Sequence, residues 1–327
     1  MPFIKQRYSI QKPTKAYLFL MNHINLTMAQ AQSYISKGKV IYQDKVLSCA
    51  DKNKILENSV EVMVFKPHST GIKPSFENED FALFNKPTQM LIHPKGRFNH
   101  HSLMDEIKQH CGDKAELIHR IDKETSGLVL VGKHKESIQI LGEMFAKRKI
   151  TKKYLALVRG KMPPYPFSIF LALSTQKKGD DLSIRSIHEK QDKPNLTFKE
   201  AKTSFEILGY YGNNTLLQAQ PLTGRTHQIR VHLFSLGYPI LGDPLYGCED
   251  YQTRAYLESE NHRHCTPQTK PSRPLTPQER LKYFGSTRLM LHSYCLKFVY
   301  KSKPYYFRSI QNFSIPQTEY PPMNFMP

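Results

Sequence analysis

Cysteine and tryptophan are scarce in this chain of 327 residues, which contains five cysteines and no tryptophan. The cysteines are widely separated and include no CxxC pair, which argues against a disulfide-stapled domain. They are expected to be free thiols in a reducing compartment, and a cytoplasmic location is predicted. The cluster ENHRHC contains His262, His264 and Cys265, but it lacks a second ligand pair at zinc-finger spacing. We interpret it as a solvated loop, and no metal site is predicted.

Long apolar runs are also missing. The longest early run, residues 16–21, is far shorter than the roughly 20 residues that span a bilayer. The first residues carry no apolar signal segment. The sequence contains neither a Walker loop nor a GxGxxG motif. No membrane anchor, export signal or nucleotide cofactor is therefore predicted.

Acidic residues are few, with 28 aspartates and glutamates against 47 lysines and arginines and a net charge of +19. Such an excess repels itself in a folded protein, so it suggests a polyanionic partner, most simply nucleic acid. An ordinary basic surface without a specific partner stays open as the alternative. Hydrophobic residues make up 39% of the chain, enough to support a packed core.

The first seventy residues are predicted to form a small basic α+β domain, with ten lysines and arginines against four acids. Thr27 and Gln30 have the spacing of a capping box at the start of a helix. Gly38 stands where a left-handed C-terminal cap is expected. Two short strands in KVIYQDKVLS and an alternating strand in SVEVMVF follow.

Lysines surround the end of this predicted helix, at Lys37, Lys39 and Lys45. The stretch AQSYISKGKVIYQDKVL resembles a small RNA-binding domain first seen in a protein of the small ribosomal subunit. That resemblance predicts contacts between the three lysines and an RNA phosphate backbone. A basic helix with a solvated face stays open as the alternative.

A longer α+β domain is predicted at 77–327, after a linker at 71–76. FALFNKP, KYLALVRGK, TLLQAQPL and LMLHSYCLKFVY are predicted strands, and ESIQILGEMFAKRK is a predicted helix. RTHQIRVHLFSLG begins a second helix that ends at Gly237. Residues 248–285 are polar, proline-rich and without periodicity, and an inserted surface loop is predicted there.

An acid precedes a predicted core strand in HRIDKETSGLVLVGK, where Asp122 stands just before an apolar run. Arg120 lies two residues earlier and would share a face with it in an extended segment, so the two could pair simply as structure. His119, Asp122 and Ser126 are the residue types of a hydrolase triad. However, triad members come from separate segments, and the GxSxG elbow is absent.

Several motifs together resemble the RluA-type RNA pseudouridine synthases. HRIDKETSGLVLVGK is similar to the family's HRLDxxTSGLL motif, KKYLALVRG to its KxYxAxVxG strand and LTGRTHQIRVHL to its GRTHQIR motif. GYPILGDPLYG and LMLHSYCLKF are similar to its next two blocks. NKPTQMLIHP is similar to the KPxG turn, except that Gln89 replaces the glycine. The resemblance covers residues 75–310, and the N-terminal domain is similar to the accessory domain of ribosomal-RNA members.

The resemblance implies a fold and an activity. The fold is a pseudouridine synthase fold, with a mixed, mostly antiparallel central sheet flanked by helices and loops. The activity is an isomerisation in which uracil leaves the ribose at N1, rotates and is rejoined through C5. The implied partner is RNA, most simply large-subunit (23S) ribosomal RNA. No metal, nucleotide or redox cofactor and no membrane are implied, and a monomer is assumed.

The resemblance also implies roles for five residues. Asp122 is the nucleophile, which attacks uracil C6 or ribose C1′ or assists formation of a glycal. Arg120 helps to displace the target base from its stack. Tyr154 stacks on the uracil, and Arg225 pairs with Asp122 and keeps it ionised. Ile229 packs on the uracil or behind the acid.

Two other classes of protein stay open at this point. One is a non-catalytic RNA-binding or ribosome-assembly factor on the same fold, which gives no reason to keep Asp122, Tyr154 and Arg225 together. The other is a base-excising hydrolase, which needs a positioned water and releases free base.

Overall fold

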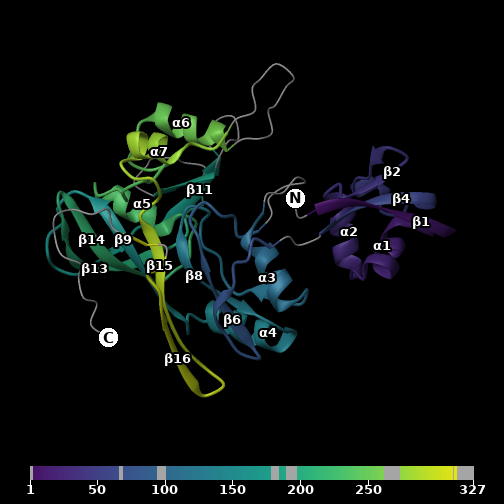
Figure 1. Cartoon of the computed structure of the whole chain (residues 1–327), viewed down its shortest axis with the longest axis horizontal. Helices are drawn as coiled ribbons and strands as arrows, with labels where there is room; N and C mark the ends of the chain where they lie inside the picture. Colours follow the sequence, from purple (N-terminus) through teal and green to yellow (C-terminus); the bar gives the residue numbers. More distant parts are fainter. Residues whose placement is uncertain are drawn as a thin grey trace. The chain divides into compact units, whose positions relative to one another are not determined.

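The computed structural model describes residues 3–65, 69–93, 101–177, 184–188, 197–260, 273–311 and 313–314. Two compact units make up the chain (Figure 1). The N-terminal unit consists of Met1–Lys73 and Leu91–Ala115, and the large unit consists of Pro74–Met90 and Glu116–Pro327. The predicted linker at 71–76 overlaps a strand that begins at Pro74. His262, His264 and Cys265 lie outside the described residues.

The N-terminal unit contains a four-stranded sheet in the order β1-β4-β2-β3. These strands are β1 (Phe3–Lys15), β2 (Val40–Tyr42), β3 (Lys45–Val46) and β4 (Ile55–Phe65), accompanied by α1 (Ala16–Ile24), α2 (Met28–Ser36), a 3-10 turn (Cys49–Asp51) and α3 (Leu103–Cys111). The buried core of this sheet and of α1 and α2 includes Phe19, Ile35 and Val62.

The predicted caps of α2 are confirmed. The Thr27 amide donates to Gln30 Oε1 at 2.9 Å, and the Gln30 amide donates to Thr27 Oγ1 at 3.3 Å. Gly38 has a φ of +63° and ends the helix in the left-handed region, as predicted. Strand β1, which the sequence analysis did not identify, pairs along most of β4. Its residues alternate weakly in hydropathy, so the pattern gave no strand signal.

The large unit is built on a ten-stranded sheet. Eight strands follow one another in the order β10-β13-β14-β9-β15-β8-β6-β5, while β16 pairs with β15 and β7 pairs with β8. Their bounds are β5 (Pro74–Glu77), β6 (Phe81–Lys86), β7 (Glu116–Leu117), β8 (Ser126–Gly132), β9 (Thr151–Arg159), β10 (Phe167–Phe170), β13 (Lys202–Tyr211), β14 (Asn214–Pro221), β15 (Leu291–Tyr300) and β16 (Lys303–Arg308). A separate hairpin joins β11 (Leu173–Lys177) to β12 (Ile184–His188). Among the described pairings within the sheet only β8 with β15 is parallel, so the predicted mostly antiparallel sheet is confirmed.

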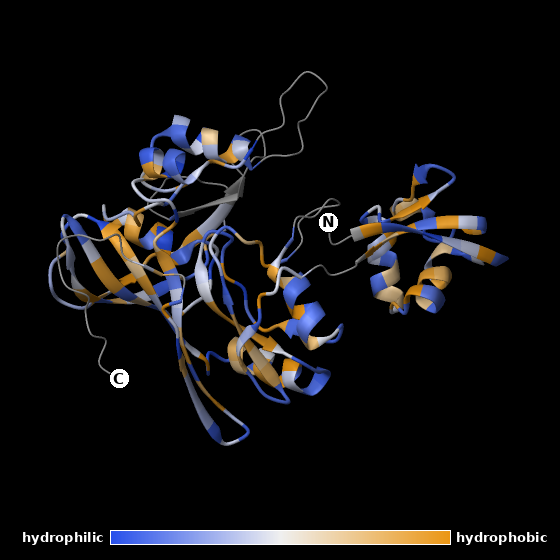
Figure 2. Cartoon of the chain, viewed as in Figure 1, coloured by the Kyte–Doolittle hydropathy of each residue, from blue (hydrophilic) through white to orange (hydrophobic). Residues whose placement is uncertain are grey.

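Two helices cover parts of this sheet. Helix α4 (Lys135–Ala146) contributes Leu141 to a buried cluster that includes Phe81 and Leu130. Helix α5 (Gln228–Ser235) packs against β12, β13 and β14. In Figure 2, the strands β9, β13 and β14 show apolar stretches, whereas the helices carry both apolar and polar residues. Burial of these apolar faces is the main favourable contribution to the fold.

The prediction of a surface loop at 248–285 is wrong, because the segment contains two helices. They are α6 (Asp250–Ser259) and α7 (Pro277–Phe284), and residues 261–272 between them lie outside the described residues. Helix α7 starts in a standard way, with Pro277 in its first turn and the Glu279 amide donating to Thr276 Oγ1 at 3.2 Å. Both helices are mostly polar (Figure 2), so no apolar period revealed them.

None of the helices in the described part of the chain is long and apolar enough to cross a membrane. Within the same residues, no group of three or more histidine, cysteine or acidic side chains is arranged to hold a metal ion.

Candidate active site

Asp122 lies in the loop between β7 and β8. The Thr125 amide donates to the Asp122 carbonyl at 3.2 Å, which turns the chain into β8. Every residue of β8 is buried. Gly127 has a φ of +109°, and a Cβ atom there would lie 2.2 Å from the carbonyl oxygen of Ser293 in β15. The glycine of the TSG motif is therefore required by the close approach of β15.

The other two triad-type residues have different partners. His119 is buried and accepts a hydrogen bond from the Leu130 amide at 3.1 Å. Burial and the charge of Lys152 lower the pKa of His119 to about 3, so its imidazole is neutral. Ser126 Oγ lies 2.7 Å from His292 Nδ1, and both side chains are fully buried. Neither residue is placed to act with Asp122 as a hydrolase triad.

Arg230 is the guanidinium that reaches Asp122. Its Nη1 donates to Asp122 Oδ2 at 3.3 Å, while Nε and Nη2 donate to the two oxygens of Asp243 at 2.7 Å each. The side chain of Arg230 is 2% exposed. A buried arginine held by two carboxylates keeps a fixed orientation.

The predicted pairing of Arg225 with Asp122 is not observed and is corrected here to Arg230. Arg225 precedes α5 in an exposed loop, and its Nε donates to the Glu200 carbonyl at 3.0 Å. The physical reason is that α5 begins only at Gln228, so Arg225 lies outside the helix and Arg230 faces the acid. A sequence signal did exist, because Arg230 stands between Ile229 and Val231 in an apolar helix. A buried arginine needs a carboxylate partner.

Electrostatics keep Asp122 ionised. Burial alone would raise the pKa of Asp122, but His227, Arg230 and Arg120 together lower it below the usual value. The side chain of Asp122 is still 27% exposed, so the carboxylate is both charged and reachable. Arg120 is exposed and acts through its charge, rather than as the structural pair that the sequence left open.

His227, which belongs to the GRTHQIR motif, is a neighbour of Asp122 to which the sequence analysis assigned no role. Its Nε2 lies 3.9 Å from Asp122 Oδ2, and its Nδ1 lies 2.9 Å from the Tyr246 hydroxyl. Burial and Arg230 lower the pKa of His227 to about 4, so it is neutral at pH 7. The residue holds a left-handed backbone, with a φ of +53°, at the start of α5. Such strain is maintained only where the surroundings impose it.

Tyr154 and Ile229 are both buried, and the charge of Asp122 acts on Tyr154. Tyr154 lies on β9, opposite Ala219 and Ser293, and is 8% exposed. Burial and the charge of Asp122 raise the pKa of Tyr154, so its hydroxyl is protonated. Ile229 is buried in the first turn of α5, next to Arg230.

Lys86 is a further charged residue that the sequence analysis missed. It is fully buried at the end of β6, and Nζ donates to the carbonyls of Pro87, Met90 and Lys123 at 2.8, 2.9 and 2.9 Å. Burial lowers the pKa of Lys86 to about 7. The lysine of the NKP stretch thus fixes the backbone directly after Asp122.

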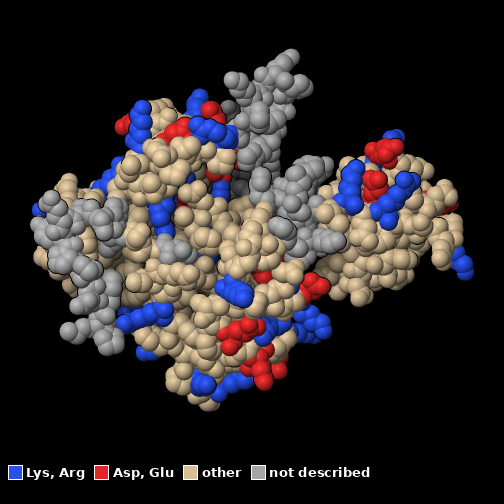
Figure 3. Space-filling model, in the orientation of Figure 1, with Lys and Arg blue, Asp and Glu red and all other residues tan. Residues whose placement is uncertain are grey.

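Of the predicted RNA-binding lysines of the N-terminal unit, Lys37 and Lys39 follow directly after α2, and Lys45 lies on β3. Lys37 and Lys45 are exposed. The Lys39 ammonium lies 4.7 Å from the centre of the Tyr34 ring, and burial together with Lys37 lowers the pKa of Lys39 to about 8. Figure 3 shows basic and acidic side chains interspersed on the visible face of each unit. On this face, the charged side chains do not outline a single binding patch.

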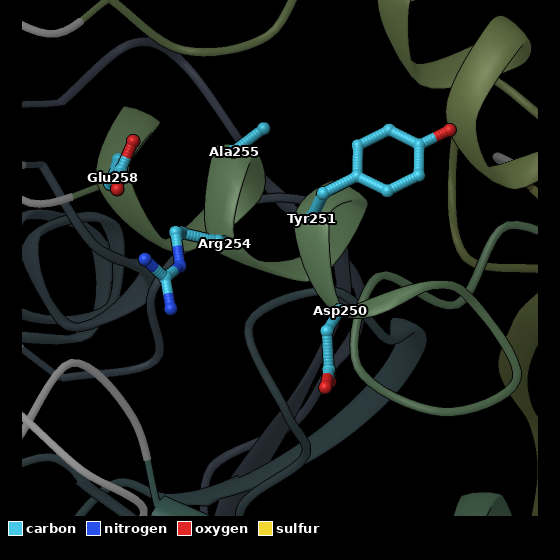
Figure 4. Close-up of a pocket in the computed structure, with 5 residues that line it drawn as sticks. All are labelled: Asp250, Tyr251, Arg254, Ala255 and Glu258. Carbon is cyan, nitrogen blue, oxygen red and sulfur yellow. The ribbon is translucent and has the colours of Figure 1, made fainter.

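A surface hollow of about 350 Å³ is visible on α6 (Figure 4). Its lining residues all come from this helix: Asp250, Tyr251, Arg254, Ala255 and Glu258. The lining combines acids with a base and includes none of the residues around Asp122. The hollow is not the candidate active site.

Comparisons with known proteins identify the family of the chain. A family model described as RNA pseudouridylate synthase matches residues 80–235. An uncharacterized RNA pseudouridine synthase of Helicobacter pylori (strain J99) is 35% identical over 305 residues, which is 93% of this chain and 94% of that protein. Ribosomal large subunit pseudouridine synthase C of Buchnera aphidicola is 36% identical over 173 residues, or 53% of each chain.

A solved structure supports the fold. Human RNA Pseudouridylate Synthase Domain Containing 1 aligns with a TM-score of 0.54 and 24% identity, over 75% of this chain and 86% of that one. The fold and the matched relatives thus define an RNA-modifying isomerase. The chain belongs to the RluA-type RNA pseudouridine synthase family, and it is an RNA pseudouridine synthase.

Proposed function

We propose that this synthase modifies uridines of large-subunit ribosomal RNA and that Asp122 is its nucleophile. The contact between Asp122 and Arg230 carries the second part of the proposal. A carboxylate that is ionised, held by an arginine and still accessible is suited to attack an electrophilic carbon. The similarity to a ribosomal large subunit synthase supports the substrate class.

The reaction breaks the bond between uracil N1 and ribose C1′ and forms one between C5 and C1′. The hydrogen on C5 leaves as a proton, so no oxidant or reductant takes part. Attack on uracil C6, attack on ribose C1′ and assistance to a glycal all use an ionised carboxylate. The geometry of Asp122 fits each of the three routes.

The residues around Asp122 have distinct proposed roles. The exposed Arg120 is free of the sheet and enters the RNA stack as the target base leaves it, which costs a few kcal/mol. Tyr154 offers the uracil an aromatic ring beside the acid. Ile229 packs behind the acid in the first turn of α5. Arg225, exposed on the loop before α5, contacts the RNA backbone.

The N-terminal unit is proposed to add RNA affinity through Lys37, Lys39 and Lys45, of which the first and last expose their charge to solvent. Such contacts depend on salt and not on sequence. The enzyme is proposed to act as a monomer without a cofactor. Cys49, Cys111, Cys248 and Cys295 form no disulfide, which fits the reducing cytoplasm as the proposed location.

Tritium release tests the chemistry. Bulk RNA labelled at uridine C5 is prepared from cells that lack the gene and is incubated with the enzyme. Isomerisation releases tritium without freeing uracil, whereas a base-excising hydrolase frees uracil. Asp122→Asn changes charge without changing shape, and release should fall by more than about a thousandfold, a barrier increase of roughly 4 kcal/mol. Activity within tenfold of wild type would falsify the role of Asp122.

Mapping of pseudouridines tests the substrate class. Ribosomal and transfer RNA from cells with and without the gene are compared, and the sites lost should lie in 23S ribosomal RNA. Losses confined to transfer RNA contradict the proposed substrate while leaving the role of Asp122 intact.

A further inference from the structure

The two residues that follow Asp122 are tied to the helices of segment 248–285. The Glu124 carboxylate is 3% exposed. Arg280 Nη2 donates to its Oε2 at 2.5 Å, and the Tyr256 hydroxyl donates to its Oε1 at 3.0 Å. Tyr256 belongs to α6 and Arg280 belongs to α7, and both are buried. The Glu124 carboxylate thus accepts one hydrogen bond from α6 and one from α7.

Lys123 makes a parallel connection. Its ammonium pairs with the carboxylate of Glu260, the residue that ends α6. The peptide carbonyls on the same stretch point elsewhere. The Lys123 carbonyl accepts from Lys86 Nζ at 2.9 Å, and the Glu124 carbonyl accepts from Thr88 Oγ1 at 2.7 Å. The side chains of residues 123 and 124 therefore hold one side of the stretch, and residues 86–88 hold the other.

Asp122 itself has few direct restraints. Its carboxylate receives one hydrogen bond from Arg230 at 3.3 Å and is 27% exposed. The position of its oxygens must therefore come largely from the backbone on which it stands. Reaction rates fall steeply when a reacting atom is displaced by about 1 Å, with losses of roughly a hundredfold.

We propose that Glu124 is a positioning residue, through which α6 and α7 hold the loop of Asp122 in its reactive placement. This inference rests on the proposed role of Asp122 as nucleophile. Segment 248–285, which was predicted to be a surface loop, then influences the reaction rate by holding the loop of Asp122, without contacting the substrate.

The chemistry of the contact supports positioning rather than simple packing. A buried ion pair loses hydration, and apolar side chains of the same volume often stabilise a fold equally well. What the pair adds is direction, because Arg280 donates Nη2 to Glu124 while its Nε donates to the Thr287 carbonyl at 3.0 Å, which fixes the guanidinium. Tyr256 restrains the second oxygen, so the Glu124 carboxylate is held at both ends.

Three variants test the proposal: Glu124→Gln, Tyr256→Phe and Glu124→Gln/Arg280→Met. With enzyme in excess over C5-tritiated bulk RNA, the maximal rate and the half-saturating enzyme concentration are measured separately. Glu124→Gln should lower the maximal rate about tenfold or more, a barrier change of 1.4 kcal/mol, with the half-saturating concentration within twofold. Tyr256→Phe removes one hydroxyl and should lower the rate at least threefold.

The double variant separates positioning from stability. Replacing both charges should restore much of the melting temperature lost in Glu124→Gln, because no buried charge is left unpaired. The maximal rate should nevertheless stay low. The matched control is Glu143→Gln, which breaks an exposed pair with Lys147 on α4 and should leave both the rate and the melting temperature unchanged.

Several results overturn the proposal. One is a maximal rate for folded Glu124→Gln within threefold of wild type. Another is a maximal rate in the double variant that recovers together with its melting temperature. The third is a change in Glu124→Gln that is confined to the half-saturating enzyme concentration. If Glu124→Gln does not fold, Tyr256→Phe decides, and a rate loss below threefold counts against the inference. The Asp122→Asn variant keeps the two questions apart: if it stays active, the proposed nucleophile is wrong, and if it is inactive while Glu124→Gln is fully active, only the positioning role falls.

Discussion

Charged side chains are used in opposite ways in the two units. In the large unit, Arg230, Asp243 and Lys86 are buried and have multiple hydrogen bonds to fixed partners. In the N-terminal unit, Lys37 and Lys45 are exposed, at the end of α2 and on β3. Buried pairs impose one geometry and are weakly screened, whereas exposed charges attract a polyanion without fixing its orientation.

The difference indicates a division of labour. The large unit places one carboxylate with the accuracy that bond making needs. In the proposed function, the N-terminal unit supplies affinity that accepts many RNA sequences, as expected of contacts with a phosphate backbone. Four sets of variants test this contrast, and their expected effects decrease from the first set to the last.

Arg230→Lys and Arg225→Lys should differ most, although both keep a positive charge. Lysine cannot reproduce the planar contacts of Arg230 with Asp243 and Asp122. The maximal rate should fall about a hundredfold, a barrier increase of roughly 2.7 kcal/mol. Arg225→Lys should change the rate by less than about threefold and act mainly on RNA affinity. Single-turnover tritium release measures both variants, and equal rate losses would show that the exposed arginine moves into the site when RNA binds.

Tyr154 tests whether the ring or the hydroxyl matters in the large unit. Tyr154→Phe keeps the ring, and Tyr154→Leu removes it. Stacking on a base is worth roughly 1–3 kcal/mol, so the leucine variant should be at least about tenfold slower than the phenylalanine variant. If both are inactive, and the phenylalanine variant accumulates a covalent adduct with RNA on a denaturing gel, the hydroxyl transfers a proton instead.

The lysines of the N-terminal unit should show a different kind of loss. Lys37→Ala/Lys45→Ala should raise the dissociation constant for ribosomal RNA a few-fold and leave the maximal rate unchanged. The slope of log affinity against log salt should become shallower by about 0.7–0.9 for each phosphate contact removed. Binding titrations at several salt concentrations measure this slope. An unchanged slope would remove these lysines from the RNA interface.

The smallest effects are expected at two glutamines with left-handed backbones. Gln43 in the N-terminal unit has a φ of +51°, and Gln89 in the large unit has a φ of +62°; both are exposed. Glycine adopts this conformation without strain but loses more entropy on folding. Gln43→Gly and Gln89→Gly should therefore each change the free energy of unfolding by no more than about 1 kcal/mol. Thermal melts measure this, and a larger loss at Gln89 would mean that its side chain supports the turn before the site.

The local patterns predicted much of the fold, since capping and alternation are properties of neighbouring residues. Thr27, Gln30 and Gly38 marked the limits of α2 because a cap involves residues only a few positions apart. Helices α6 and α7 were not predicted because several of their buried residues are polar, as at Thr253 and Arg280. An apolar period cannot report a helix that buries a guanidinium.

The sequence motifs predicted which segments form the site, but they did not predict which side chains contact each other. Asp122 stood out because an acid before a buried strand is unusual. The choice between Arg225 and Arg230 depended on where α5 begins, and that start is set by contacts far away in the sequence. The Gln228 side chain, for example, donates to the Lys202 carbonyl at 2.9 Å. Glu124 was hidden for the same reason, because its partner lies 156 positions later in the chain.

The shared guanidinium of Arg230 has a consequence for the catalytic cycle. In either covalent route, Asp122 becomes an ester and loses its negative charge for part of each turnover. Arg230 would then be a cation in a dry interior, were Asp243 not permanently bound to it by two hydrogen bonds. Because Asp243 remains as the counter-ion of Arg230, the charge of Asp122 can change while Arg230 stays paired. The residues around each intermediate therefore keep the same positions.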